Sequence, residues 1–198
     1  MHPRQCSACE VLYGTMDADK ISRNVAECIY TGIIHDTGVF KYSCTSKKTM
    51  EIAGEMMEKG IDYSDIIDNT FYKKTYVQNQ ILGRALLESV LFYDGKCIFT
   101  TVTIDEMEFY GVTGRELGGI VEQLRLTDGV EVAIFLYQTG EEEYKVSLRS
   151  KKKIDVAAIA TQFGGGGHVR AAGYTAKGSV YQIINSIGEL IEKQYNAM

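Results

Sequence analysis

In the first third of the chain, apolar residues recur at helical spacing. Ile21, Val25, Ile29 and Ile33 recur every fourth residue and predict one buried helical stripe. The expected helices cover 7–16 and 19–34, and a third begins at Thr45 or Ser46 and ends at Gly60. This part of the chain is therefore predicted to be helical.

The pattern changes near Ser89. Residues 66–88 contain no proline and predict one or two connecting helices. Beyond them, Asp94-Gly95 separates the short apolar runs 90–93 and 97–103, which predicts a β-hairpin. The chain is therefore expected to enter a sheet-containing domain at this point.

The rest of the chain alternates between the two periodicities. The expected elements are a helix over 113–124, strands over 130–138 and 143–150, a helix over 155–163, and a terminal helix with a stripe of Ile183, Ile184, Ile187, Leu190 and Ile191. Hairpins interleaved with helices predict the α/β class, with a mixed sheet covered on one or both faces. The expected division is 1–65, a helical connector over 66–88, and a small mixed-sheet α/β domain over 89–198.

Four consecutive glycines, Gly164 to Gly167, follow the helix expected over 155–163. Glycine is the costliest residue to order, so the run indicates a tight turn or a close approach of main chain to a ligand. Successive N–H groups would bind an anion, a helix start after the run would add partial positive charge, and His168 and Arg170 would supply further donors. A flexible linker is the alternative, although the apolar flanks argue against it.

Ser147 and Arg149 lie in the strand expected over 143–150, where alternation places both on the same side. A planar guanidinium suits bidentate capture of a phosphate. Lysines 151–153 follow directly, and a solvated surface explains them equally well.

Composition narrows the range of partners. A net charge of −5 and a pI near 5.3 argue against long nucleic acids, whereas a short nucleotide needs only a few placed cations. No apolar run approaches the roughly 18 residues that span a bilayer, and the first ten residues lack a signal-peptide pattern. The five cysteines are an odd number scattered among apolar residues, as expected of buried free thiols. We therefore expect a cytoplasmic protein without a membrane partner.

Two blocks of the sequence resemble a known family. The segment 163–173, FGGGGHVRAAG, together with 144–150, resembles the C-terminal substrate-binding (DHHA1) domain of DHH-family phosphoesterases. Segments 7–13 and 30–43 resemble the last third of the catalytic DHH domain. Within the family, the similarity is greatest to the branch that hydrolyses short oligoribonucleotides and 3′-phosphoadenosine 5′-phosphate.

The resemblance implies roles for particular residues. Asp36, in His-Asp-Thr-Gly, would be a catalytic residue and a ligand to a pair of Mn²⁺ ions. His35 would line the cleft, contact the metal ligands from behind, or be an ordinary surface residue. The substrate would be short single-stranded RNA, 3′-phosphoadenosine 5′-phosphate or a related nucleotide, and the protein would form a homodimer. The substrate-binding residues would be Ser147, Arg149, Gly165, Gly166, Gly167 and His168.

The family's other metal ligands, an early Asp-x-Asp, a His and an Asp-His-His, have no counterpart here. Asp17-Ala18-Asp19 lies after the first matching block, where an aspartate is expected to cap a helix. One carboxylate does not hold two hard cations against water. The chain is therefore expected to be amino-terminally truncated and inactive alone.

Two other functions fit parts of the sequence. A nucleotide- or RNA-binding module that does not cleave is the main alternative. Asp36-Thr37-Gly38 and residues 81–87 also resemble pieces of retroviral aspartic proteases, but that fold is nearly all β and the intervening spacing is helical. Cys6 and Cys9 form a lone Cys-x-x-Cys with no second pair, which is weak support for a zinc or redox site.

Overall fold

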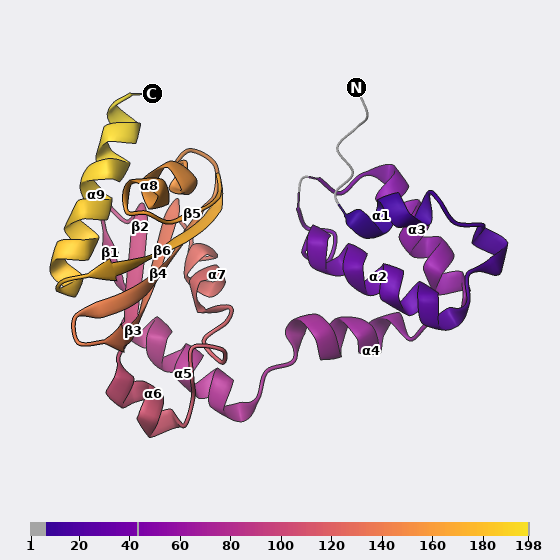
Figure 1. Cartoon of the computed structure of the whole chain (residues 1–198), viewed down its shortest axis with the longest axis horizontal. Coiled ribbons are helices and arrows are strands. Elements are labelled where there is room, and N and C mark those ends of the chain that lie inside the picture. Colours follow the sequence, from indigo (N-terminus) through magenta and orange to yellow (C-terminus); the bar gives the residue numbers. More distant parts are fainter. Residues whose placement is uncertain (1–6, 43, 198) are drawn as a thin grey trace. The chain divides into compact units, whose positions relative to one another are not determined.

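The computed structural model describes residues 7–42 and 44–197. The chain forms two compact units, Met1–Lys74 and Thr75–Met198 (Figure 1).

The division between the units lies earlier than the expected boundary near Ser89. Helix α5 (Tyr76–Leu87), which we expected in the connector, buries Ile81 and Ala85 completely in the core of the second unit. Its start is fixed by Thr75, whose hydroxyl accepts from Gln78 N while the Gln78 side chain accepts from Thr75 N. The connector helix therefore packs as part of the second unit.

The first unit is helical, as expected. Its described elements are α1 (Ala8–Tyr13), the 3₁₀ turn η1 (Ala18–Lys20), α2 (Arg23–Thr37), α3 (Lys47–Glu58), α4 (Tyr63–Ile67) and the π-helical turn η2 (Asp68–Tyr72). Ser22 and Ser46 cap α2 and α3, and the predicted stripe of α2 buries Ile29 and Ile33 against Met56 and other residues of α3. Helix α2 runs three residues past the expected end at Ile34, so Asp36 lies inside it.

The second unit is a mixed α/β domain, also as expected. After α5 it contains β1 (Val90–Phe92), β2 (Cys97–Val102), α6 (Ile104–Tyr110), α7 (Ile120–Arg125), β3 (Val132–Gly140), β4 (Glu143–Ser150), α8 (Val156–Gln162), β5 (Gly166–His168), β6 (Ala171–Lys177) and α9 (Val180–Asn196). The strands lie in the order β1-β2-β3-β4-β6-β5, with β2 and β3 parallel and every other described pair antiparallel.

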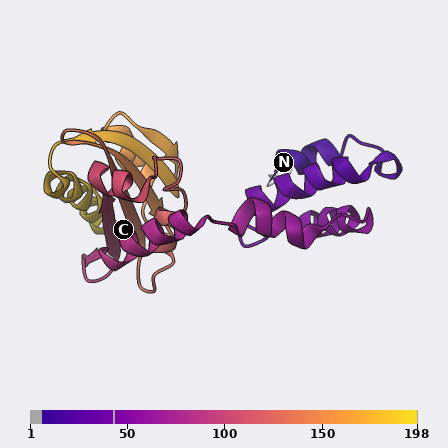
Figure 2. The same ribbon diagram turned by 90° about the horizontal axis from the view of Figure 1, so that it is seen from below.

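The sheet buries a hydrophobic core on each face. Helices α8 and α9 cover one face, where Ile159 and Ile187 pack against Ile134 and Leu148. Helices α5 and α7 cover part of the other face, where Leu124 packs against Phe135. In Figure 2, α9 (yellow) and α5 (magenta) lie on different sides of the sheet. Of the two expected arrangements, helices on one face or on both, the structure has helices on both.

Three elements were missed by the sequence analysis. Helix α6 carries a capping box in which the Thr103 hydroxyl accepts from Glu106 N and the Glu106 carboxylate accepts from Thr103 N, a signal that the sequence displays. The helix expected over 113–124 is reduced to α7, since Gly119 precedes it with a φ of 93°. Strands β5 and β6 lie where a glycine loop followed by a helix start was expected.

The cysteines differ from the expectation of buried free thiols. Cys28 is exposed and Cys44 takes part in a disulfide bond, whereas Cys97 is free and fully buried, as expected. Burial raises the pKa of the Cys97 thiol to about 12, with a smaller contribution from the Glu131 carboxylate. We therefore expect iodoacetamide at pH 8 to alkylate Cys28 in the folded chain and Cys97 only after unfolding. Peptide mass spectrometry after timed alkylation checks this, and early modification of Cys97 would show that the sheet core is open.

No helix in the part of the chain that the structure describes combines the length and the apolar character needed to cross a bilayer.

Candidate functional site

The strand register places four of the expected site residues on one face of the sheet. Arg149 of β4 lies opposite Ala171 of β6, and Ala171 lies opposite His168 of β5. Residues that lie directly opposite each other in neighbouring strands project to the same face. Arg149 and His168 are two strand spacings apart, roughly 10 Å, which is within the span of one nucleotide.

A second row runs parallel to the first. Ser147 lies opposite Gly173, and Gly173 lies opposite Gly166. Ala171 and Gly173 of β6 lie between the polar side chains of β4 and β5. Because their side chains are a methyl group and a hydrogen atom, they cover little of the main chain of β6. We call the surface formed by Ser147, Arg149, Gly166, His168, Ala171 and Gly173 the open face. The alternation that predicted a shared side for Ser147 and Arg149 is confirmed.

Lys145 is a cation of this surface that the sequence analysis did not include. It lies two residues before Ser147 on β4, opposite Thr175, and is exposed. The same alternation that linked Ser147 to Arg149 would have found it.

Arg149 is held by contacts within the second unit. Its Nε donates to Oε1 of Glu122 over 2.6 Å, and its Nη1 donates to the carbonyl oxygen of Leu148 over 3.0 Å. Glu122 lies on α7, and its other oxygen accepts from Nε of Arg125 over 2.9 Å. One carboxylate thus lies between two guanidinium groups and leaves a net positive charge at the edge of the open face.

Three of the four consecutive glycines are required by the fold. Gly164 has a φ of 76° and ends α8, where the N–H groups of Gly164 and Gly165 donate to carbonyl oxygens of Thr161 and Ala160. A Cβ on Gly165 would lie 2.3 Å from the Gly173 oxygen. A Cβ on Gly167, whose φ is 147°, would lie 2.4 Å from the Ala171 oxygen.

Gly166 differs from its neighbours. Its φ lies outside the left-handed range that favours glycine, and a Cβ there would meet nothing within 4 Å. The space over Gly166 is therefore open for a ligand to approach the main chain.

The expected helix start after the glycines is wrong. The run follows the carboxyl end of α8 and continues into the edge strand β5, which pairs with β6. A helix end at this point carries partial negative charge, so the helix contributes no attraction for an anion. Any anion must therefore be held by the side chains of the open face and by strand N–H groups.

Arg170 also differs from its expected role. Its guanidinium donates to the carbonyl oxygens of Lys152 and Ile154 and so supports the loop after β4. In the same loop, N–H groups of residues 152–154 donate to the Glu131 carboxylate, and Lys151 Nζ donates to the Thr127 oxygen. This basic run serves the fold of the loop.

Asp36 lies in the last turn of α2, in the first unit, and is exposed. The neighbouring His35 is exposed as well, and its ring lies 5.6 Å from that of Phe71 in an edge-to-face contact. Thr37 is buried and accepts from Phe40 N, and Gly38 ends the helix with a φ of 59°. The chain therefore turns sharply after Asp36.

No group of three or more His, Cys, Asp or Glu side chains within residues 7–42 and 44–197 is arranged to hold a metal ion. The donors described around Asp36 therefore do not fit a Mn²⁺ pair, and its role as a ligand stays a prediction.

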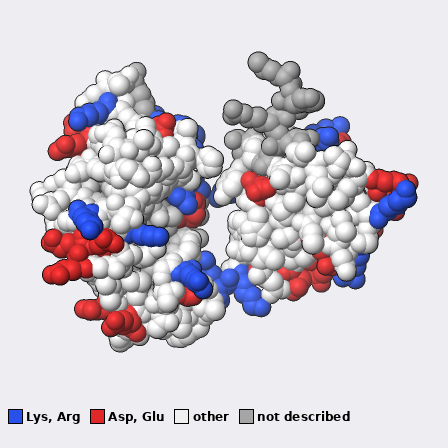
Figure 3. Space-filling view, in the orientation of Figure 1, with Lys and Arg blue, Asp and Glu red and all other residues white. Residues whose placement is uncertain are grey.

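The surface charge agrees with a small ligand. In the view of Figure 3, Lys and Arg side chains are scattered among Asp and Glu side chains and form no continuous basic area. Long nucleic acids bind mainly through their phosphates and require a continuous basic area. The side of the molecule seen in Figure 3 does not provide one.

Comparison with known proteins finds a family match over the part of the chain that contains the open face. The profile of the DHHA1 domain matches residues 94–194, which include the whole open face. A bifunctional oligoribonuclease and PAP phosphatase NrnA of Thermus thermophilus is 33% identical over 155 residues, covering 78% of this chain and 45% of that protein. The NrnA of Bacillus subtilis is 27% identical over 154 residues, covering 78% of this chain and 48% of that protein.

The crystal structure of an exopolyphosphatase-related protein from Bacteroides fragilis shares the fold, with a TM-score of 0.89 and 27% identity. The match covers 97% of this chain and 58% of that one. The chain thus spans about half the length of the curated relatives it matches.

Proposed function

Because the chain belongs to the DHHA1 domain family, we propose that its second unit binds the phosphate-bearing end of a short nucleotide on the open face. The substrate class is short single-stranded RNA or 3′-phosphoadenosine 5′-phosphate. The observation that carries the proposal is the pair of register rows that aligns Arg149 with His168 and Ser147 with Gly166.

Each group of the open face has a distinct part in this binding. The guanidinium of Arg149 donates to phosphate oxygens, and the Ser147 hydroxyl donates to the same group from the adjacent row. His168 contacts a second phosphate or the base from the edge strand. Gly166 leaves room for the ligand to reach the main chain, while Gly165 and Gly167 keep β5 against β6.

Glu122 orients Arg149 and limits nonspecific anion binding. Its carboxylate fixes Nε of Arg149, so part of the rotamer entropy is lost before the ligand arrives. Glu122 also cancels one of the two guanidinium charges. A single small anion therefore gains little binding free energy, whereas a ligand that also reaches Ser147 and His168 gains more.

We further propose that the open face serves a hydrolase that cleaves phosphoesters of this substrate class, as the names of the relatives suggest. Asp36 is the catalytic candidate within this chain. Since the described donors do not fit a Mn²⁺ pair, no step of binding is assigned to a metal. A homodimer and a cytoplasmic location stay predictions.

A nucleotide-binding module without catalysis is the second candidate, favoured by the same set of donors. It predicts the same binding without turnover by this chain.

Isothermal titration calorimetry in EDTA tests the binding proposal. We expect the 198-residue chain to bind 3′-phosphoadenosine 5′-phosphate at least tenfold more tightly than adenosine, because charge-assisted hydrogen bonds to phosphate contribute about 1.5–3 kcal/mol. Equal affinity for the two ligands would show that the phosphate groups do not contribute to binding. Product formation from the same ligand with added Mn²⁺ would exclude the second candidate, since a module that only binds gives none.

A further inference from the structure

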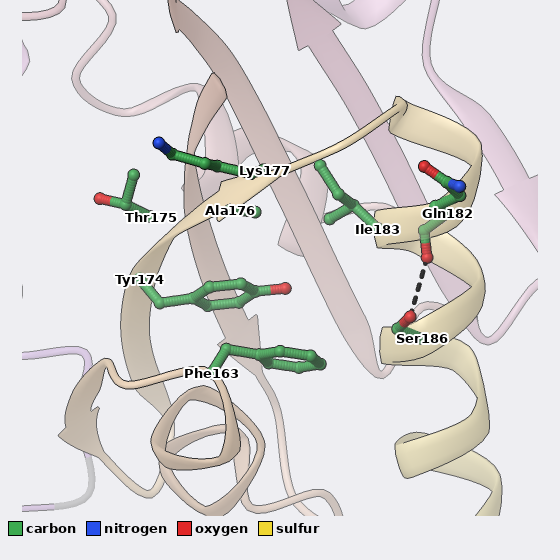
Figure 4. Close-up of a pocket in the computed structure, with 8 residues that line it drawn as sticks. All are labelled: Phe163, Tyr174, Thr175, Ala176, Lys177, Gln182, Ile183 and Ser186. Carbon is green, nitrogen blue, oxygen red and sulfur yellow. Dashed lines mark hydrogen bonds between the residues drawn. The ribbon is translucent and has the colours of Figure 1, made fainter. Parts of the chain in front are cut away.

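The opposite face of the sheet contains a cavity that takes no part in the proposed phosphate binding. It has a volume of about 200 Å³ and lies between β6, the end of α8 and α9 (Figure 4). Tyr174 and Ala176 of β6 project toward it, whereas Thr175 and Lys177 project from the other side of the strand. The cavity is smaller than the roughly 300–1,000 Å³ of sites for drug-sized ligands, and its size suits a single heteroaromatic ring.

Tyr174 contributes a hydroxyl that has no hydrogen-bond partner among the described residues and borders the cavity. Its side chain is 8% exposed and its ring stacks on Phe163, with centroids 4.7 Å apart and planes at 14°. In Figure 4 the hydroxyl points across the cavity toward α9. Burial raises the pKa of the Tyr174 hydroxyl, so this group is protonated and can donate at neutral pH. The hydroxyl is therefore a donor that the protein leaves available to a group in the cavity.

Ser186 supplies an acceptor on the facing helix. Its hydroxyl donates to the carbonyl oxygen of Gln182 over 2.9 Å, as the dashed line in Figure 4 marks. With its proton committed, the oxygen lone pairs accept from a ligand. One donor and one acceptor therefore border the same space.

The cavity favours a neutral ligand. Lys177 is the charged residue among those that line it, and its side chain points away and pairs with Glu143 over 3.4 Å. Ile183 and Ala176 add apolar surface beside the aromatic pair. A bound charge would thus be desolvated without compensation.

We propose that this cavity binds a neutral planar lactam of the uracil type. The ring carbonyl accepts from Tyr174, the adjacent ring N–H donates to Ser186, and the ring packs beside Phe163 and Ile183. A lactam edge presents one acceptor and one donor side by side, which matches the two hydroxyl groups. The site is separate from the open face and does not depend on the phosphate proposal.

Titration of the full chain with uridine, followed by the backbone amide shifts of residues 174–186, tests the inference. We expect saturable shifts, and we expect Tyr174→Phe, which keeps the stacked ring, to raise the Kd about tenfold through loss of one hydrogen bond. N3-methyluridine, which lacks the ring N–H, should bind the unaltered chain about tenfold more weakly than uridine.

Two matched controls complete the experiment. Tyr181→Phe removes a hydroxyl from a residue of α9 that is 75% exposed and should leave the Kd unchanged. Arg149→Ala should also leave it unchanged, which separates this cavity from the open face. Absence of saturable binding by the unaltered chain, equal affinity of Tyr174→Phe, or equal affinity for N3-methyluridine would each overturn the assignment.

Discussion

Replacing Gly165 with alanine should lower the free energy of unfolding of the second unit by about 3 kcal/mol, the upper range for an overpacked site. The added Cβ would lie 2.3 Å from the Gly173 oxygen and 2.4 Å from Tyr174 Cβ, and both neighbours belong to β6. A main-chain oxygen in a paired strand cannot move aside without loss of the β5–β6 pairing. Urea denaturation followed by circular dichroism measures the effect.

Gly166→Ala is the matched control for this prediction. A Cβ there meets nothing within 4 Å, so the free energy of unfolding should change by less than about 1 kcal/mol. The same variant should nevertheless weaken nucleotide binding, because its methyl group occupies the space over the open face. Equal destabilisation by the two substitutions would show that β5 does not pair as described.

Arg149→Ala should weaken the binding of 3′-phosphoadenosine 5′-phosphate by about 10- to 100-fold. Charge-assisted hydrogen bonds to a phosphate contribute about 1.5–3 kcal/mol, and each 1.4 kcal/mol is a factor of ten. Binding of adenosine should change little, since it lacks the phosphate. Calorimetric titration of both ligands measures the difference.

Arg115→Ala makes the same change in charge at an exposed position outside the open face and should leave both affinities unchanged. The Arg149–Glu122 pair is partly exposed, with side-chain exposures of 28% and 36%, so its loss should cost at most about 1 kcal/mol of stability. A well-folded Arg149→Ala variant that binds the bisphosphate normally would remove this arginine from the site.

Local periodicity accounts for what the sequence predicted correctly. The stripe of Ile183, Ile187 and Ile191 in α9 is a pattern of neighbouring residues, and all three side chains are buried as expected. The shared side of Ser147 and Arg149 follows from the two-residue repeat of a strand in the same way.

The parts that failed depend on contacts between distant segments. The pairing of Gly166 with Gly173 leaves no side-chain signal, because neither residue has a side chain, so the run resembled a loop. Glu122 approaches Arg149 across 27 positions of sequence, and nothing near either residue indicates the pair. Sequence alone therefore indicated candidate residues that share the open face, but not the strand pairing that aligns them.

The most direct test of the open face is a titration of the ¹⁵N-labelled chain with 3′-phosphoadenosine 5′-phosphate, read from the amide shifts. We expect saturating shifts at Gly166, Gly167, His168 and residues 147–149, with a common Kd. Saturation that leaves these amides unmoved, while other parts of the chain shift, would contradict it.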